Sequence, residues 1–419
     1  MSCKLRAGGP AALVTLLLLS GCGTTAAGSG AAPGGSRGPT AAPSSGTTRG
    51  TVVTPDPPVA APFRHRLPGM PPVIGNDVYS QTRAGMLAPQ VRHDPALLYV
   101  PDSNGYRVTV ISQRTHRVVR VIPAGYLSQH VVPSYDLRTL YTNSSAADQL
   151  MTIDPRTGRR TGAIPMPRPY NLYFTPDGRT AIVMVEQYDT IRFADPHSWH
   201  TIEDLKPPGC LGPNHADFSG NGRFFVVTCE FSGELVKIGT LSHRVEGVIH
   251  LDPQPTAAHA APMTMGRSVP QDVRLSPDGR TFYVADMGTN ELRLISARTF
   301  RQVGVIGMPR MPHGIYPSRD GTRLYVSDRG AGEVSVLDPA TNTIVDTWTI
   351  PGGGSPDMGG VSADGRMLWL SGRNDGVVYG FDTRAGKLVA TIPVGGSPHG
   401  LAVWPQPGRY SLGHTGNMR

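Results

Sequence analysis

Short apolar runs, rich in aromatic and β-branched residues, recur along this chain at nearly constant spacing. The central residues of seven such runs are 42, 41, 44, 57, 42 and 44 positions apart. The runs are residues 98–100, 140–142, 181–183, 225–227, 282–284, 324–326 and 368–370. A period of about 40–45 residues with four short strands per unit is typical of β-propellers.

Each repeat unit contains four short segments with strand patterning. A first apolar strand leads into a turn such as "SPDGR", "SGNGR" or "SADGR", in which Asp-Gly or Asn-Gly supplies the positive φ of a tight hairpin. The apolar run is the second strand, an alternating segment such as "EVSVLD" is the third, and "IVDTWTI" or "KLVATIPV" is the fourth. No segment has a helical period, so the pattern predicts an all-β, seven-bladed β-propeller of four-stranded antiparallel blades.

Two segments of the sequence are candidates for the strand that closes the ring. Seven units supply second, third and fourth strands, but an eighth first-strand segment, "HGLAVWP" at residues 399–405, follows the last unit. An open edge strand invites aggregation, so we expect this segment to form the inner strand of the first blade. Alternatively, residues 76–94 supply that strand and the C-terminal segment packs elsewhere.

The N-terminal part has the pattern of an exported lipoprotein. Lys4 and Arg6 precede an apolar run at residues 11–19 that is too short to cross a bilayer, and "LSGC" ends at Cys22. We therefore expect a signal peptide at residues 1–21 and a lipidated Cys22. A plain secretory signal with a chance Cys is the alternative. Residues 22–61, rich in Gly, Ala, Pro, Ser and Thr, should form a disordered linker, and residues 62–419 the propeller.

Charge and location restrict the class of partner. The formal net charge is +8, but the Lys and Arg residues are scattered and form no basic helix or aromatic-interleaved patch. We expect no nucleic-acid partner. The expected location is the extracytoplasmic side of a bacterial cell membrane, where the lipid anchor alone contacts the bilayer. A protein or a cell-wall polymer is the candidate partner, and the chain is expected to be a monomer.

The repeats resemble a known family. The SPDG-type turn, the Leu-Tyr-Val strand and the Val-x-Val-Ile/Leu-Asp strand, repeated over about residues 80–410, resemble the YVTN-repeat (YncE-like) seven-bladed β-propellers, which are mostly exported bacterial proteins. The repeats also look like the propeller domains of cytochrome d1 nitrite reductases and quinoprotein amine dehydrogenases. This second likeness implies a shared fold and not a shared chemistry.

The residues just before each first strand should surround the mouth of the central channel. At these positions the sequence supplies His130, Asn171, His215, Asp272, His313, Asp357 and His399. Converging His and Asp side chains can hold a divalent metal or a polar ligand, and His is the usual general base near neutral pH. The competing interpretation, which the Pro-His-Gly step favours, is structural: the imidazoles satisfy backbone groups of the next blade.

The loops after the second strands open on the same face. They contain Asn104, Asn143, Glu186, Glu230, Asp286, Asn290, Asp328, Arg329, Arg373 and Asn374. Most are expected to be turn formers. Arg329 and Arg373, in adjacent blades, can clamp a carboxylate or a phosphate because a guanidinium suits both; otherwise they are solvated loop charges.

Two cysteines remain once Cys3 and Cys22 are assigned to the leader and the lipid. Cys210 and Cys229 should form a disulfide in an oxidising compartment. A reduced redox-active or metal-binding pair is the alternative, and without Cys-x-x-Cys-His covalent c-type haem is excluded. An insertion at residues 253–268 overhangs the channel mouth; His259, Met263 and Met265 there could bind copper(I), although a flexible loop is favoured.

No local catalytic motif is present: the chain lacks a nucleophile elbow, a P-loop, a dinucleotide fingerprint and His-Glu-x-x-His. We therefore expect a surface-tethered binding or scaffold propeller that engages a ligand or partner on its top face, without a required cofactor. The alternative class is an exported enzyme whose His/Asp metal site performs lactonase- or lyase-like chemistry. A redox partner that holds a non-covalent cofactor is a third hypothesis.

Overall fold

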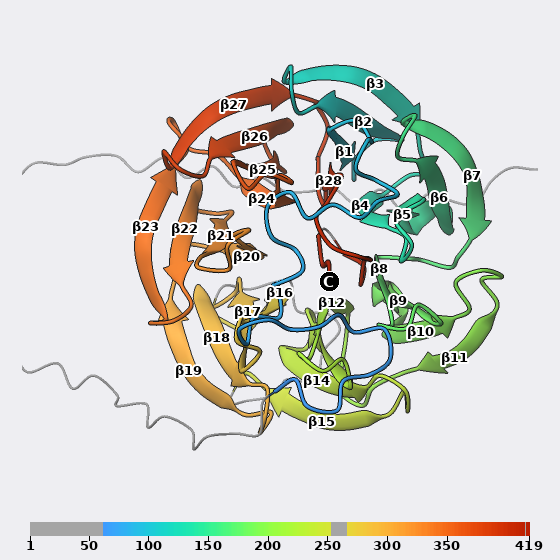
Figure 1. Cartoon of the computed structure of the whole chain (residues 1–419), viewed down its shortest axis with the longest axis vertical. Helices are drawn as coiled ribbons and strands as arrows, with labels where there is room; N and C mark the ends of the chain where they lie inside the picture. The colour runs from blue at the N-terminus through green and yellow to red at the C-terminus, as the bar shows by residue number, and fades with distance from the viewer. Residues whose placement is uncertain (1–61, 253–265, 415) are drawn as a thin grey trace, which may run out of the picture. The chain divides into compact units, whose positions relative to one another are not determined.

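Seven sheets arranged in a ring are the main feature of the computed structural model, which describes residues 62–252, 266–414 and 416–419. Within these residues every sheet is antiparallel and four-stranded, and the sheets surround a central channel (Figure 1). The predicted seven-bladed, all-β fold is therefore confirmed. All described residues lie in one structural unit, Pro57–Arg419.

The first blade closes the ring, because it combines strands from both ends of the propeller. It consists of β28 (Ala402–Trp404), β1 (Leu97–Pro101), β2 (Arg107–Ser112) and β3 (Arg117–Pro123). Leu98 pairs with Val403 and Leu97 with Trp404. The favoured closure is confirmed, and the alternative in which residues 76–94 supply the inner strand is wrong.

The other six blades follow the chain without crossovers. Blade 2 is β4 (Ser128–Pro133), β5 (Leu140–Ser144), β6 (Gln149–Asp154) and β7 (Arg159–Pro165); blade 3 is β8 (Asn171–Phe174), β9 (Ala181–Val185), β10 (Thr190–Ala194) and β11 (Thr201–Leu205). Blade 4 is β12 (Pro213–Phe218), β13 (Phe224–Cys229), β14 (Glu234–Gly239) and β15 (Val245–His250); blade 5 is β16 (Pro270–Leu275), β17 (Thr281–Asp286), β18 (Glu291–Ser296) and β19 (Gln302–Gly307). Blade 6 is β20 (Pro312–Pro317), β21 (Leu324–Asp328), β22 (Glu333–Asp338) and β23 (Thr343–Thr349); blade 7 is β24 (Pro356–Val361), β25 (Met367–Gly372), β26 (Val377–Asp382) and β27 (Lys387–Pro393). Two 3-10 turns, η1 (Ser145–Ala147) and η2 (Glu186–Tyr188), follow β5 and β9.

Burial falls from the channel to the rim of each blade. Inner strands such as β12 and β24 are buried along their whole length, because neighbouring blades cover both of their faces. Outer strands such as β3 and β7 expose most of their residues to solvent. Any polar side chain on an inner strand is therefore held away from bulk water, which sets the chemistry of the channel.

Segments outside the repeat fill the ends of the channel. The tail after β28, residues 409–419, folds back on itself and is here called the C-terminal hairpin; its end lies at the centre of the ring (Figure 1). Leu412 N donates to Asn417 O at 2.8 Å within this hairpin, and Phe174 N of β8 donates to Leu412 O at 3.0 Å. The segment that precedes β1 packs on the turns between first and second strands; Val78 N, for example, donates to Pro277 O at 2.8 Å.

Candidate functional site

Seven of the nine predicted site residues lie at the start of the inner strands. His130 is on β4, Asn171 on β8, His215 on β12, Asp272 on β16, His313 on β20 and Asp357 on β24, and His399 lies three residues before the start of β28. Each is 2% exposed or less. The structure thus brings the predicted ring together, and the binding role of its members stays a prediction.

A local irregularity of the inner strands aims these side chains. In β12 the register shifts between Pro213 and Ala216, and β4, β16, β20 and β24 carry the same irregularity at the equivalent position. A β-bulge adds a residue to one strand and turns a side chain away from its regular direction. The bulges therefore explain why blades 2, 4, 5, 6 and 7 present their His or Asp to the channel.

The carboxylate of Asp357 contacts two histidines and two arginines. His399 Nδ1 donates to Asp357 Oδ2 at 2.7 Å, and His313 Nδ1 lies 3.1 Å from Oδ1. Arg329 Nη1 is 3.4 Å from Oδ1 and Arg373 Nη1 is 3.6 Å from Oδ2. Burial would raise the pKa of Asp357, but the facing histidines and Arg329 hold it well below its usual range, so Asp357 is ionised.

A cavity of about 200 Å³ at the channel mouth is lined by the four side chains that contact Asp357, among others. Its lining residues are Tyr170, Glu230, Gln271, Met311, His313, Arg329, Arg373, Asn374 and His399. Four of the nine predicted residues, His313, Arg329, Arg373 and His399, thus line it, and the other five are buried and do not line it. Tyr170 Oη lies 3.5 Å from His399 Nε2 within this lining.

Two neighbouring carboxyl groups share one amide partner, and one of them, Glu230, lines the cavity. Asn214 Nδ2 donates to Glu186 Oε1 at 3.1 Å and also contacts Glu230 Oε2. Burial, followed by the neighbouring Glu230, raises the pKa of Glu186 well above its usual value. The environment of Glu186 thus disfavours its charged form.

Further histidines gather beneath the cavity. The rings of His130 and His399 have their centroids 4.8 Å apart, and His215 and His414 are 4.7 Å apart. Burial above all lowers the pKa of His130, His215, His313 and His414 well below 6.5, and that of His399 to about 4. The imidazoles are thus neutral at pH 7, and one nitrogen of each ring keeps its lone pair.

The expected hydrogen bonds from imidazole to backbone are not found for two of these residues. Both ring nitrogens of His130 and of His215 lack a hydrogen-bond partner among the described residues, although each side chain is fully buried. His313 and His399 face Asp357 instead of the neighbouring backbone. The structural explanation of the Pro-His-Gly step therefore does not account for His130 and His215.

His414 is the residue that the repeat pattern missed. It lies at the tip of the C-terminal hairpin, where its backbone N donates to Leu172 O at 3.0 Å. Asn171 Nδ2 is 3.1 Å from its Nδ1, and Asp272 Oδ1 is 3.7 Å from its Nε2. The available signal was indirect: a tail that follows a ring-closing inner strand starts beside the channel, and this tail contains a histidine.

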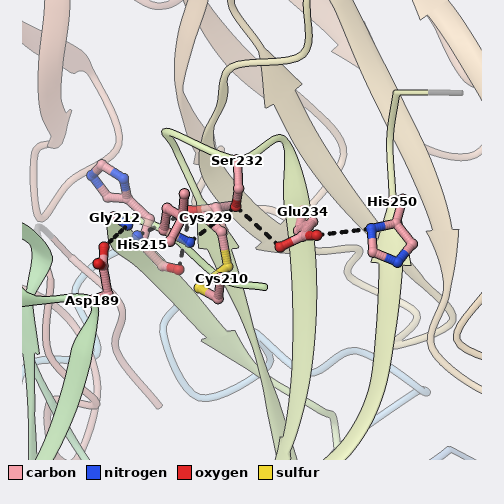
Figure 2. Close-up of a disulfide and its surroundings, with 10 residues drawn as sticks. Asp189, Cys210, Gly212, His215, Cys229, Ser232, Glu234 and His250 are labelled. Carbon is pink, nitrogen blue, oxygen red and sulfur yellow. Dashed lines mark hydrogen bonds and ion pairs between the residues drawn. A yellow bond between two sulfur atoms is a disulfide. The ribbon is translucent and has the colours of Figure 1, made fainter. Parts of the chain in front are cut away.

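The predicted disulfide between Cys210 and Cys229 is present beside this site. Figure 2 shows it next to Gly212 and His215, in the loop that leads into β12. Gly212 N donates to Asp189 Oδ1 at 2.9 Å, and Leu211 N donates to Ser232 Oγ at 3.0 Å. The disulfide and these bonds together fix the segment that carries Asn214 and His215.

The insertion predicted to overhang the mouth cannot be placed, because residues 253–265, with His259, Met263 and Met265, lie outside the described residues. The described cavity and histidines come from the blades and the C-terminal hairpin alone.

These features define a class of protein, a seven-bladed propeller whose channel is rich in neutral histidines. The model of the YNCE-like beta-propeller family matches residues 256–407, which is less than half of the chain. No curated protein matches the sequence.

Solved structures share the fold at low sequence identity. A protein of unknown function from Desulfotomaculum acetoxidans DSM 771 is 15% identical, with a TM-score of 0.57, covering 72% of this chain and 98% of that chain. Hydrazine synthase from Kuenenia stuttgartiensis is 17% identical (TM-score 0.55; 72% and 93% covered), and the dihydro-heme d1 dehydrogenase NirN in complex with DHE is 15% identical (TM-score 0.55; 76% and 77%). Identities this low support a common fold only.

Proposed function

We propose that this protein is an exported binding propeller that holds a small anionic ligand, a carboxylate or a phosphate, in the cavity at its channel mouth. The single observation that carries the proposal is the presence of Arg329 and Arg373 together in the wall of that cavity. Two guanidinium groups from adjacent blades match the geometry of such an anion.

The arginines keep most of their donor capacity. Each guanidinium has five N–H donors, and good charge-assisted bonds to a carboxylate are about 2.7–2.9 Å long. The contacts of Arg329 and Arg373 with Asp357, at 3.4 and 3.6 Å, are longer than this. Arg329 Nη2 also lies 2.7 Å from Met287 Sδ, but a thioether is a weak acceptor. An anion in the cavity would satisfy donors that the protein itself satisfies poorly.

A carboxyl group in the cavity lining favours certain ligands. Glu230 lines the cavity, so a ligand that also carries a hydrogen-bond donor on that side would be favoured over a simple inorganic anion. The volume of about 200 Å³ suits a small molecule or the end group of a chain. The same chemistry is offered by a free metabolite and by the terminal carboxylate or phosphate of a cell-wall polymer.

Binding is tested by chemical unfolding of the purified protein in the presence of small carboxylates, phosphates and soluble cell-wall fragments. A ligand at 100 times its Kd should stabilise the fold by about 2.7 kcal/mol. Arg329→Gln combined with Arg373→Gln should weaken binding at least tenfold, because a hydrogen bond to a charged group contributes about 1.5–3 kcal/mol.

Arg384→Gln is the control, since Arg384 is an exposed turn residue of blade 7. Stabilisation by cell-wall fragments alone would identify the polymer as the source of the anion. Equal binding by the double variant and the control, or no stabilisation by any anion, would refute the proposal.

We also propose that the lipid on Cys22 holds the propeller at the outer side of the cell membrane. The disulfide Cys210–Cys229 supports export, because disulfides persist in oxidising compartments. Among the described residues, no helix is both long enough and apolar enough to cross a bilayer. Cys22→Ala should abolish incorporation of a labelled fatty acid and release the protein from the membrane fraction. A variant that stays labelled and membrane-bound would overturn this assignment.

A further inference from the structure

Three buried histidines beneath the cavity form a cluster of unusual composition. One nitrogen from each of His130, His215 and His414 lies within 4.8 Å of the other two, and all three side chains are fully buried. Buried polar groups are normally hydrogen-bonded, yet neither nitrogen of His130 or His215 has such a partner among the described residues. Two rings aimed into one place without partners indicate that something else belongs there.

The spacing suits one metal ion. Even at the full 4.8 Å spacing, three atoms around a common centre lie less than about 1 Å beyond the 2.0–2.1 Å of a zinc–imidazole bond. Small rotations of the rings would close this gap. Three neutral imidazoles without a thiolate match Zn²⁺, Cu²⁺ or Ni²⁺ better than Mg²⁺ or Ca²⁺, which prefer oxygen ligands.

The surroundings place a carboxylate beside the cluster. Asp272 Oδ1 lies 3.7 Å from His414 Nε2, where its charge would offset that of a bound cation. Arg274 Nη2 lies 3.4 Å from the other oxygen of this carboxylate, Asp272 Oδ2, and so helps to hold Asp272 in place. Carboxylates next to metal-bound histidines commonly orient the ring and strengthen binding.

We propose that His130, His215 and His414 bind a divalent transition-metal ion, with Zn²⁺ as the best fit, and that the ion fixes the C-terminal hairpin inside the channel. The first two ligands belong to β4 and β12, whereas the third comes from the hairpin. A bound ion therefore ties the tail to two blades. Three protein ligands leave one position of a tetrahedral zinc site open. This site is separate from the anion cavity and does not depend on it.

Two side chains of the cavity wall neighbour the cluster. Tyr170 and His399 both line the cavity, and their rings lie 5.0 and 4.8 Å from that of His130.

The test measures Zn²⁺ binding by the full-length protein, purified without a polyhistidine tag and stripped with a chelator. We expect one Zn²⁺ per chain to remain bound after gel filtration. His130→Gln and His414→Gln should each weaken binding by more than the roughly 10–100-fold that loss of an outer-shell partner costs. His200→Gln, a change of an exposed histidine, should bind like the unmodified protein.

A second readout follows the hairpin itself. Zn²⁺ should slow amide hydrogen exchange at His414 and Asn417 in the unmodified protein and leave it unchanged in His130→Gln, whose substitution lies outside the hairpin. The result that overturns the proposal is an unmodified protein that retains no stoichiometric Zn²⁺. Binding by His414→Gln as tight as that of the His200→Gln control would overturn it equally, and so would Zn²⁺-dependent protection that persists in His130→Gln.

Discussion

Replacing Arg419 by methionine destabilises the folded propeller by about 3–5 kcal/mol, the range measured when one partner of a buried ion pair is removed. Arg419 is fully buried in the channel, where its Nη2 lies 3.0 Å from Asp217 Oδ1. Its guanidinium also lies over the Tyr79 ring, 5.1 Å from the centroid. Without this guanidinium the buried carboxylate of Asp217 loses its salt-bridge partner.

Part of the loss is offset, which favours the lower end of that range. Asp217 still accepts hydrogen bonds from Phe218 N at 2.7 Å and Leu275 N at 2.8 Å. Urea unfolding followed by tryptophan fluorescence measures the change. Arg409→Met is the matched control, because Arg409 belongs to the same hairpin but is exposed and should change the stability by less than about 0.5 kcal/mol. Equal unfolding midpoints for the two variants would contradict this role of Arg419.

The repeated part of the fold could be predicted from the sequence because each blade repeats the same local requirements. Asp-Gly or Asn-Gly turns fix the first hairpin, and apolar second strands such as residues 282–284 fix the period. The closing strand was also predictable, since an unpaired inner segment at residues 399–405 has one free position in a ring that must close. These features depend on local sequence and on closure, and both can be found without coordinates.

The site could be predicted only as far as the repeat extends. His130, His215, His313 and His399 occupy equivalent positions in their blades, so their convergence follows from the period. Their side-chain partners do not follow from the period. Asp357 contacts His313 and His399, whereas His130 and His215 have no hydrogen-bond partner among the described residues. Blade-to-blade differences in side-chain partners arise from packing across the channel, which the repeat does not encode.

The C-terminal hairpin escaped prediction for a different reason. It has no repeat and no strand alternation, and it is held by partners distant in sequence, such as Asp217 for Arg419 and Leu172 for His414. Such a segment is placed by complementarity with a channel that exists only after the ring has formed. Because the C-terminal hairpin depends on such distant contacts, a ligand that bridges it to the blades should stabilise it.

Removing the disulfide has the second large expected effect. Cys210→Ala combined with Cys229→Ala should lower the free energy of unfolding by about 3 kcal/mol, because the cross-link closes a short loop in the unfolded chain. The two cysteines are separated by 19 positions and are buried among the apolar side chains of blades 3 and 4. Alanine avoids the added cost of burying a serine hydroxyl at either position.

Reductant supplies the internal control for this variant. Urea unfolding of the unmodified protein with reductant should move to the midpoint of the double variant, while the double variant itself should not respond. If the two proteins unfold at the same urea concentration without reductant, the cross-link does not stabilise the fold. Local exchange gives a further readout: the amide protons of Leu211 and Gly212, which are bonded to the side chains of Ser232 and Asp189, should exchange faster once the cross-link beside them is gone. Because this loop leads into β12, which carries His215, the variant should also bind Zn²⁺ more weakly.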